Sequence, residues 1–293
     1  MSAEVFASLL IYGITVGVLY GVVASGLGLI YGVMRILNIA HGTLLMIGAF
    51  GMFWLFDLWG ITPLWSILVV TPLLAIPGFI LYKIIVSPIG KAGSVELRER
   101  STLIAFFGVL IVIENSCLLL WTAEHRTVTY LRIPLDLVFV NINVNRLVIL
   151  GVSIAIIGLL HLYLTRTYMG KAIRAVTQDQ EAGMMMGVNA EQLTLYCFAI
   201  STALAGVAGS LVGILSVINP LMGFPFLIRS FVVMIIGGTA NVKGWLYAGV
   251  VLGIAEFIGA YFLGEGYREA IAYIILVVFL VLASRGYLAR WRR

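Results

Sequence analysis

The sequence predicts an all-α polytopic membrane protein with roughly 8 to 10 transmembrane helices. Of its 293 residues, 62% are hydrophobic and only 11% are charged, whereas an ordinary soluble domain carries about 25% charged residues. Arg35 and Asp57 are the only formal charges from Val5 to Tyr82, and none occurs from Gln192 to Ile228. We therefore expect a single transmembrane domain over residues 1–293.

Apolar runs close to the length that crosses a bilayer recur along the whole chain, and each is an expected helix. Charged, polar or glycine-rich segments separate the runs and set the expected boundaries. Several runs are shorter than a full span, which is why the expected number of helices is a range. In chain order, the expected helices are 5–23, 42–58, 62–86, 102–121, 147–165, 193–217, 229–239, 246–264 and 269–284.

The first expected interruption, 24–41, lies between the first two helices. The chain reads GLGLIYGVMRILNIAHG from Gly26 to Gly42. Charged and strongly hydrogen-bonding groups at membrane depth are costly, so they tend to mark a pathway, a gate or a break in the helix. We therefore expect an interrupted hinge here. The pathway or gate residues expected in it are Arg35, Asn38, His41 and Gly42.

These side chains also allow a purely structural interpretation. Arg35 can extend to the lipid headgroups. Asn38 and His41 can hydrogen-bond the backbone groups that are freed where the helix breaks.

A second expected interruption occurs at 237–244, where glycines, an amide and one cation separate two apolar runs. Small residues also recur every four positions in two helices, a pattern that lets helix backbones approach closely in lipid. Both patterns favour two related halves, as in an inverted repeat, with the substrate site between the halves. The pathway residues expected here are Gly237, Gly238 and Asn241, and the small-residue stripes are Gly13, Gly17, Gly21 and Ser25, and Ser201, Ala205, Gly209 and Gly213.

Glu114 and Asn115 interrupt the apolar run 102–121. A charged carboxylate against lipid is costly, so we expect Glu114 to face the interior of the bundle. It would meet the ammonium group of an amino acid there, or it would be neutral or pair with Arg35 or His41. Glu114 and Asn115 are therefore further candidates for the pathway.

The remaining titratable residues predict no metal site or disulfide. Cys117 and Cys197 lie in apolar runs, where a free thiol packs as a small hydrophobe, and the histidines are isolated from one another. Glu256 is expected to pair with a basic residue near an interface.

Lysine and arginine divide unequally between the two expected sides of the membrane, thirteen against five. Because short cytoplasmic loops collect these residues, we expect 166–192 and the basic tail 285–293 in the cytoplasm and 122–146 outside. Alternating residues from Leu137 to Asn143 predict short extended structure in the outer loop. The net charge of +5 is explained by this inside bias and does not indicate nucleic acid.

No phosphate-binding loop of the form G-x-x-x-x-G-K-[ST] occurs in the sequence. We therefore do not expect this chain to be an enzyme: ATP and Mg would be bound by a separate subunit docked on the cytoplasmic face. The expected docking surface is 166–192, because Met184, Met185 and Met186 offer adaptable apolar contacts. An amphipathic connector lying on the lipid headgroups is equally compatible with this segment.

Three motifs of the sequence resemble a known family, the Liv-type ABC transporter permeases for branched-chain amino acids. The similar runs occur in the family's order and span most of the chain. They are GVMRILNIAHGTLLMIGA at 32–49, GKAIRA at 170–175 with Asp179, Ala182 and GVN at 187–189, and GGTANVKG at 237–244 with Gly249 and GIAE at 253–256.

The resemblance implies the partners of the chain. They are a second permease chain in a homodimer or heterodimer, two cytoplasmic ABC ATPase subunits and an extracytoplasmic solute-binding protein, in a bacterial or archaeal plasma membrane. The residues that the resemblance assigns to ATPase coupling are Lys171, Arg174, Asp179, Glu181, Ala182, Gly187 and Asn189.

The function expected from these observations is import of branched-chain or related hydrophobic amino acids by ATP-driven alternating access. The family also includes permeases for urea, short amides and organic acids, which are alternative substrates. Two other classes stay open: a proton-coupled transporter that uses Glu114 with His41 or His161, and a passive channel for a small neutral solute. Neither of these classes needs a docking surface on the cytoplasmic side.

Overall fold

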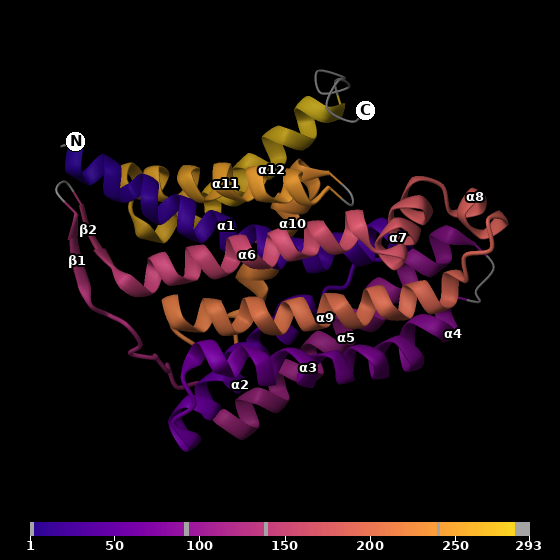
Figure 1. The fold of residues 1–293 in the computed structure, drawn as a ribbon, viewed down its shortest axis with the longest axis horizontal. Helices are drawn as coiled ribbons and strands as arrows, with labels where there is room; N and C mark the ends of the chain where they lie inside the picture. The colour runs from indigo at the N-terminus through magenta and orange to yellow at the C-terminus, as the bar shows by residue number, and fades with distance from the viewer. Residues whose placement is uncertain (1–2, 91–93, 138–139, 239–240, 285–293) are drawn as a thin grey trace.

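The computed structural model describes residues 3–90, 94–137, 140–238 and 241–284 (Figure 1). Within these ranges the chain is a helical bundle. Eight of the described helices are long and apolar enough to cross a membrane, and a ninth apolar helix is shorter. The expected all-α polytopic fold is therefore confirmed. The tail 285–293 lies outside the described residues.

The elements follow one another along the chain with short connections. In order they are α1 (Ala3–Met34), α2 (His41–Trp59), α3 (Pro63–Leu81), the π-helical turn η1 (Tyr82–Val86), α4 (Ser87–Gly90), α5 (Val95–Trp121), β1 (Pro134–Leu137), β2 (Val140–Asn143), α6 (Val144–Arg166), α7 (Tyr168–Gln178), α8 (Gln180–Met185), α9 (Ala190–Leu215), α10 (Gly223–Gly237), α11 (Val242–Leu263), the 3-10 turn η2 (Glu265–Tyr267) and α12 (Arg268–Ser284).

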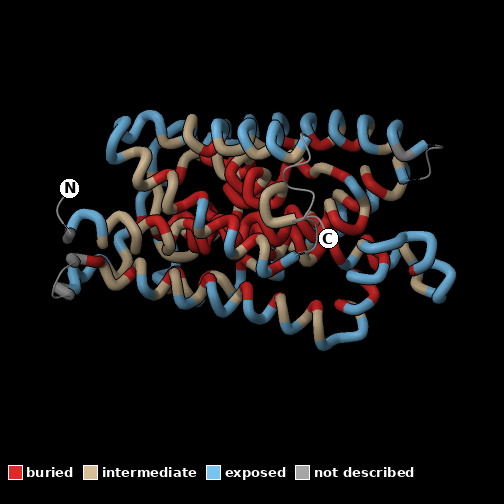
Figure 2. Tube along the Cα trace, turned by 90° about the horizontal axis from the view of Figure 1, so that it is seen from above, coloured by how far each residue is buried: buried red, intermediate tan, exposed pale blue. Residues whose placement is uncertain are grey.

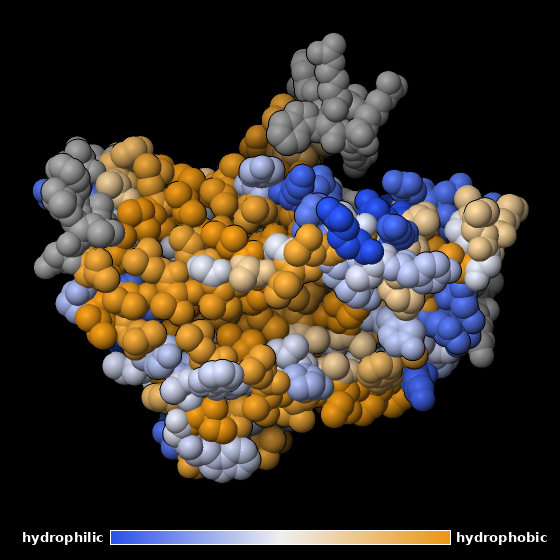
Figure 3. All heavy atoms as spheres, in the orientation of Figure 1, coloured by the Kyte–Doolittle hydropathy of each residue, from blue (hydrophilic) through white to orange (hydrophobic). Residues whose placement is uncertain are grey.

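The bundle has two distinct ends. Strands β1 and β2 form an antiparallel hairpin at one end, which we name the hairpin end, and α7 and α8 lie at the other, which we name the α7–α8 end (Figure 1). An apolar surface extends between the ends, and hydrophilic residues gather around α7 and α8 (Figure 3). This division is typical of a protein that spans a bilayer.

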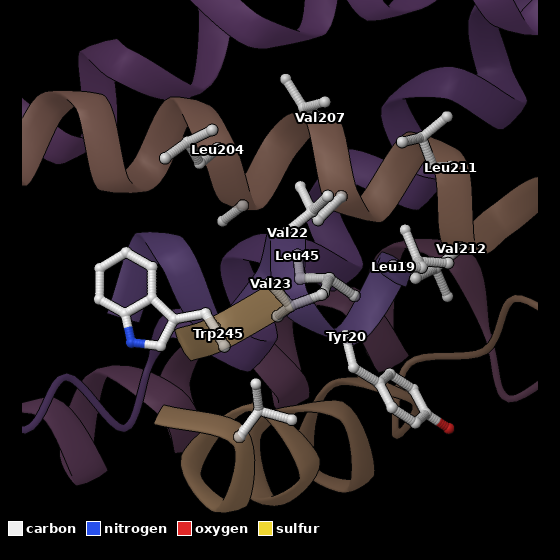
Figure 4. Packing of buried hydrophobic residues seen from close by; sticks show 14 of the residues in the cluster. Leu19, Tyr20, Val22, Val23, Leu45, Leu204, Val207, Leu211, Val212 and Trp245 are labelled. Carbon is white, nitrogen blue, oxygen red and sulfur yellow. The ribbon is translucent and has the colours of Figure 1, made fainter. Parts of the chain in front are cut away.

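Helices α1 and α9 form the centre of the core. Buried residues concentrate in the middle of the bundle, whereas the outer helices expose one side along their length (Figure 2). Side chains of α1 such as Leu19 and Val22 pack between Leu211 of α9 and Trp245 of α11 (Figure 4). In α12, by contrast, Ala272 is the only described residue that is buried.

The small-residue stripes are the surfaces on which these central helices pack. A Cβ on Gly17 would lie 2.7 Å from the Cα of Val250, and one on Gly253 would lie 2.7 Å from the backbone N of Gly17. A Cβ on Gly209 would lie 2.9 Å from the backbone N of Ala49. Only glycine permits backbones to approach this closely, as the spacing predicted.

The packing has the pattern of an inverted repeat. Helix α1 runs from the hairpin end to the α7–α8 end, and α9 runs in the opposite direction (Figure 1). Each is followed by a short non-helical segment and then by a shorter helix, α2 or α10. Helix α1 packs mainly on α11, and α9 packs on α3 and α2 about equally. Exchanging the two halves therefore reproduces the arrangement with reversed direction.

The expected hinge at 24–41 is wrong in its extent. Helix α1 continues to Met34, and only 35–40 is non-helical. The glycines in this part of α1 serve packing instead of a break: a Cβ on Gly28 would overlap the ring of Trp245, and one on Gly26 would lie 2.7 Å from His41 Cε1.

Other expected boundaries also differ from the structure, and α11, for example, begins at Val242 instead of residue 246. Helix α5 begins at Val95 instead of residue 102, because the Ser94 side chain accepts a hydrogen bond from Leu97 N at 3.2 Å and caps the helix. Helix α10 begins at Gly223 instead of residue 229. The outer loop expected at 122–146 ends earlier, because α6 begins at Val144. The hairpin β1–β2 confirms the extended structure that was expected in this loop.

Candidate functional site

Helices α2, with 19 residues, and α10, with 15 residues, start inside the bundle and meet there. We name them the half-length helices because each extends from the middle of the bundle toward one end. A Cβ on Gly223 would lie 2.7 Å from the carbonyl carbon of Gly42, so the first turns of α2 and α10 touch. His41, the first residue of α2, lies beside the middle of α1 and of α9, since its Nε2 is 3.2 Å from Val23 O and its ring and Ser201 O both border Gly26. The two helix N-termini therefore meet far from either end of the bundle.

From this junction the two helices diverge. Arg126 packs over Phe50 and Trp54 of α2 and pairs with Ile218, which follows α9, so α2 runs toward the hairpin end. Helix α10 runs toward the α7–α8 end. A helix N-terminus presents free N–H groups and a partial positive charge, and the two N-termini here face each other.

Two polar side chains at this junction have atoms without a hydrogen-bond partner among the described residues. Both the Oδ1 and the Nδ2 atoms of Asn38 are buried without a partner, as is Nδ1 of His41. Buried polar groups are normally paired, so an exception needs an explanation. Asn38 was expected to hydrogen-bond freed backbone, and this expectation is wrong for its side chain. For His41 the contact with Val23 O agrees with it.

Arg35 lies apart from Asn38, His41 and Gly42. It adopts a left-handed backbone conformation with φ of 57°, and its amide N donates to Tyr31 O at 2.9 Å, so it ends α1 sharply. Its side chain is exposed and borders a polar cavity of about 250 Å³ at the α7–α8 end, together with Arg98 and Glu191.

The second expected interruption is the connection between α10 and α11. Asn241 Oδ1 accepts from Gly244 N at 3.0 Å and caps α11, and Trp245 Nε1 donates to Gly238 O at 2.8 Å. Gly237 packs against Gly244. Residues 239–240 lie outside the described part of the chain. The segment that meets the first break is therefore 216–222 with Gly223, which follows the Asn219–Pro220 step.

Gly223 is the site residue that sequence reasoning missed. The signal was present in the Asn219–Pro220 step at the end of the uncharged α9 run. Asn219 Oδ1 accepts from Leu221 N at 2.9 Å, which holds the turn leading into α10. The glycine-rich run at 237–244 was predicted as the second interruption because it is longer than the segment 216–222. In the structure it forms a turn at the end of the bundle.

Glu114 does not face the bundle interior, contrary to expectation. Helix α5 lies at the edge of the bundle and buries a narrow face formed by Thr102, Phe106, Leu110 and Cys117. Glu114 is half-buried beside this face, and Asn115 is exposed and donates to Ile111 O at 2.8 Å. Among the described residues, no ion pair joins Glu114 to Arg35 or His41.

The residues assigned to coupling lie on or beside α7 and α8. Thr167 and Asp179 cap the two helices, each accepting a backbone hydrogen bond at 3.0 Å, and Asn189 caps α9. Gly187 has φ of 84° and turns the chain between α8 and α9. Lys171, Arg174, Glu181 and Ala182 are exposed.

Helix α7 is amphipathic, and its apolar face is covered by the bundle. Ala172, Ile173 and Val176 are buried, while Gly170 packs closely on the end of α6. Met185 and Met186 at the end of α8 are 85% and 86% exposed. The structure therefore fixes α7 rigidly and leaves an apolar group of α8 uncovered.

A buried ion cluster, named here the Glu256 cluster, joins α1, α10, α11 and α12. Glu256 is fully buried and accepts from Arg229 Nε at 2.9 Å, Arg268 Nε at 3.2 Å and Tyr20 OH at 2.8 Å. Arg229 also lies 3.7 Å from Glu269. The sequence predicted that Glu256 has a basic partner, which is confirmed, but it did not identify the partners.

A bundle of spans built as two inverted halves, with half-length helices meeting inside it, is the architecture of a membrane transport protein. Residues 9–283 match the family model of the branched-chain amino acid transport system permease component. The chain belongs to this family, as its motifs predicted, and is a multi-pass membrane protein.

Similar proteins cover nearly the whole chain. The high-affinity branched-chain amino acid transport system permease protein BraD of Pseudomonas aeruginosa is 30% identical over 96% of this chain and 95% of its own length. LivH of Salmonella typhimurium is 28% identical, and the match covers 95% of this chain and 94% of LivH. The probable LivH of Methanocaldococcus jannaschii is 31% identical, and the match covers 90% of this chain and 86% of that relative. No solved structure matches the chain.

Proposed function

We propose that this chain is the membrane-spanning permease subunit of an ABC importer for branched-chain amino acids. The match of residues 9–283 to the permease family carries this proposal. The relatives named above are permeases of branched-chain amino acid transport systems, and they align with this chain from end to end.

The α7–α8 end is the proposed cytoplasmic side, and α7 with α8 is the proposed docking site for an ATPase subunit. The excess of lysine and arginine on this side supports the orientation. Exposed methionines next to a rigidly packed amphipathic helix suit contact with a partner groove. ATP and its Mg²⁺ would be held by the two ATPase subunits, because this chain has no phosphate-binding loop.

The translocation step is proposed to use the junction of α2 and α10. Movement of α7 and α8 on ATP binding would shift α1 and α9, which hold the two half-length helices. Asn38 and His41 carry unpaired polar atoms at this junction, and helix N-termini favour carboxylates. Solute delivered by an extracytoplasmic binding protein would then pass between this chain and a second permease chain, past Glu114 and Asn115.

The test is purification of the tagged chain from its native host in mild detergent. We expect a P-loop ATPase to copurify, and Met185→Asp to reduce its recovery strongly. Leu58→Asp is the matched control, because Leu58 is also exposed, at 66%, but lies in the last turn of α2 at the hairpin end. Recovery of the chain alone would contradict the proposal.

The substrate is tested by uptake into proteoliposomes that contain the copurified complex and the binding protein. We expect ATP-dependent accumulation of leucine, isoleucine or valine. Uptake of urea, amides or organic acids in place of these would show another substrate. Uptake without ATP that follows a pH gradient, or downhill flux alone, would replace the importer with a proton-coupled transporter or a channel.

A further inference from the structure

The polar cavity at the α7–α8 end is separate from the junction of α2 and α10. It has a volume of about 250 Å³ and lies between the end of α1, η1 with α4, the beginning of α5, the first residue of α8 and the beginning of α9. Sequence motifs did not single it out, except through Arg35 at its edge. Its lining brings both signs of charge together with apolar side chains.

The positive side of the cavity includes Arg98. The Nε atom of Arg98 is buried and has no hydrogen-bond partner among the described residues. A guanidinium prefers a planar acceptor such as a carboxylate, which it binds with two parallel hydrogen bonds. An unpaired buried donor at the wall of a cavity therefore indicates an anionic group on the ligand.

The cavity lining carries two carboxylates, Glu99 and Glu191, and the carboxylate of Glu191 is held by a hydrogen bond. Ser87 Oγ donates to Glu191 Oε1 at 3.3 Å, and Tyr82 OH donates to the Glu191 carbonyl at 3.0 Å. The other carboxylate oxygen, Oε2, has no hydrogen bond within the described residues. Ile36 and Val86, both buried, line the cavity between the charged groups.

We propose that this cavity binds a free apolar α-amino acid as its zwitterion. Arg98 receives the carboxylate, Glu191 receives the ammonium group, and the apolar wall contacts the side chain. The identity of the amino acid as leucine, isoleucine or valine rests on the proposed function. The cavity lies on the side to which the importer would release its substrate, so its ligand is the released product.

The position of the cavity connects its ligand to the coupling helices. Gln180, the first residue of α8, lines the same cavity as Arg98 of α5 and Arg35 at the end of α1. A ligand held between these elements restrains α8 relative to α1. Amino acid that accumulates on this side is therefore expected to slow the transport cycle.

The experiment is equilibrium binding to the complex in nanodiscs, without ATP and without the binding protein. The probes are leucine, 4-methylpentanoate, which lacks the ammonium group, and isopentylamine, which lacks the carboxylate. Arg98→Gln is expected to weaken leucine and 4-methylpentanoate by about tenfold or more and to leave isopentylamine unchanged. Glu191→Gln is expected to weaken leucine and isopentylamine and to leave 4-methylpentanoate unchanged.

The control is Arg100→Gln, because Arg100 pairs with Glu96 on the exposed face of α5. Leucine binding that Arg98→Gln and Glu191→Gln leave unchanged, or that Arg100→Gln weakens equally, would overturn the proposal. ATP-dependent uptake of leucine by the same complex tests the proposed function separately. Uptake without this binding pattern overturns only the cavity site, and the binding pattern without uptake overturns only the importer.

Discussion

Neutralising Glu256 is expected to destabilise the protein strongly. Glu256 is fully buried and is the counter-ion of Arg229, whose side chain is only 8% exposed, and of Arg268, which is 30% exposed. In Glu256→Gln the amide keeps one acceptor oxygen but loses the negative charge. Arg229 then keeps only Glu269, which is half-exposed and 3.7 Å away, and Arg268 keeps no ion pair among the described residues.

The magnitude follows from the burial of these charges. Removing one partner of a buried ion pair leaves an uncompensated charge, which costs about 3–5 kcal/mol. The assay is the free energy of unfolding by SDS titration in mixed micelles. Glu96→Gln is the control, because Glu96 and Arg100 are 73% and 74% exposed and such surface pairs contribute only about 0–1 kcal/mol.

A second variant separates lost charge from lost packing. Arg229→Met in the Glu256→Gln background removes the most buried uncompensated charge, so it is expected to restore part of the lost stability. If Glu256→Gln costs less than about 1 kcal/mol, as a surface pair does, the ion cluster does not hold α10, α11 and α12 on α1. If the double variant regains no free energy of unfolding, lost packing and not lost charge causes the destabilisation.

Three further variants test the packing of the bundle and the junction. Gly17→Leu is expected to abolish stable folding, because a Cβ there would lie 2.7 Å from the Cα of Val250. The control Gly151→Leu, whose Cβ would meet nothing within 4 Å, is expected to keep a monodisperse gel-filtration profile. Equal behaviour of the two variants would contradict the contact between α1 and α11. Asn38→Leu is expected to raise thermal stability, because a buried unpaired amide costs about 1–3 kcal/mol. The same variant is expected to lower uptake in proteoliposomes. Lower thermal stability would mean that the amide of Asn38 is paired. Trp245→Phe removes the 2.8 Å hydrogen bond to Gly238 O and part of a fully buried indole ring. It is expected to cost more in SDS unfolding than the hydrogen bond alone, which contributes about 0.5–1.5 kcal/mol, and an unchanged free energy would contradict both contributions.

Helix positions followed from the sequence because a transmembrane helix depends on local properties. A run of apolar residues must satisfy its own backbone hydrogen bonds in lipid, so each run forms a helix. The expected helices correspond to the nine apolar helices of the described chain, and the differences lie at their ends. Capping by Ser94 and Asp179 explains where α5 and α8 begin.

The candidate site was predicted less completely. Asn38, His41 and Gly42 were found because they interrupt an apolar run, but the opposite half of the junction is Gly223 and not the longer glycine-rich turn. Glu114 was placed in the interior because of its cost in lipid. Whether an apolar helix is central or peripheral is not written in its own composition, and α5 is peripheral.

The membrane class, the helices, the small-residue stripes and the permease family can be read from the sequence, because each is carried by a local pattern or a contiguous motif. Which helices meet follows from the folded bundle alone. Tyr20 and Glu256 are hydrogen-bonded although they are 236 residues apart, and the two half-length helices meet through residues of different halves. Such contacts depend on the fit of whole helices against one another, which no single segment specifies.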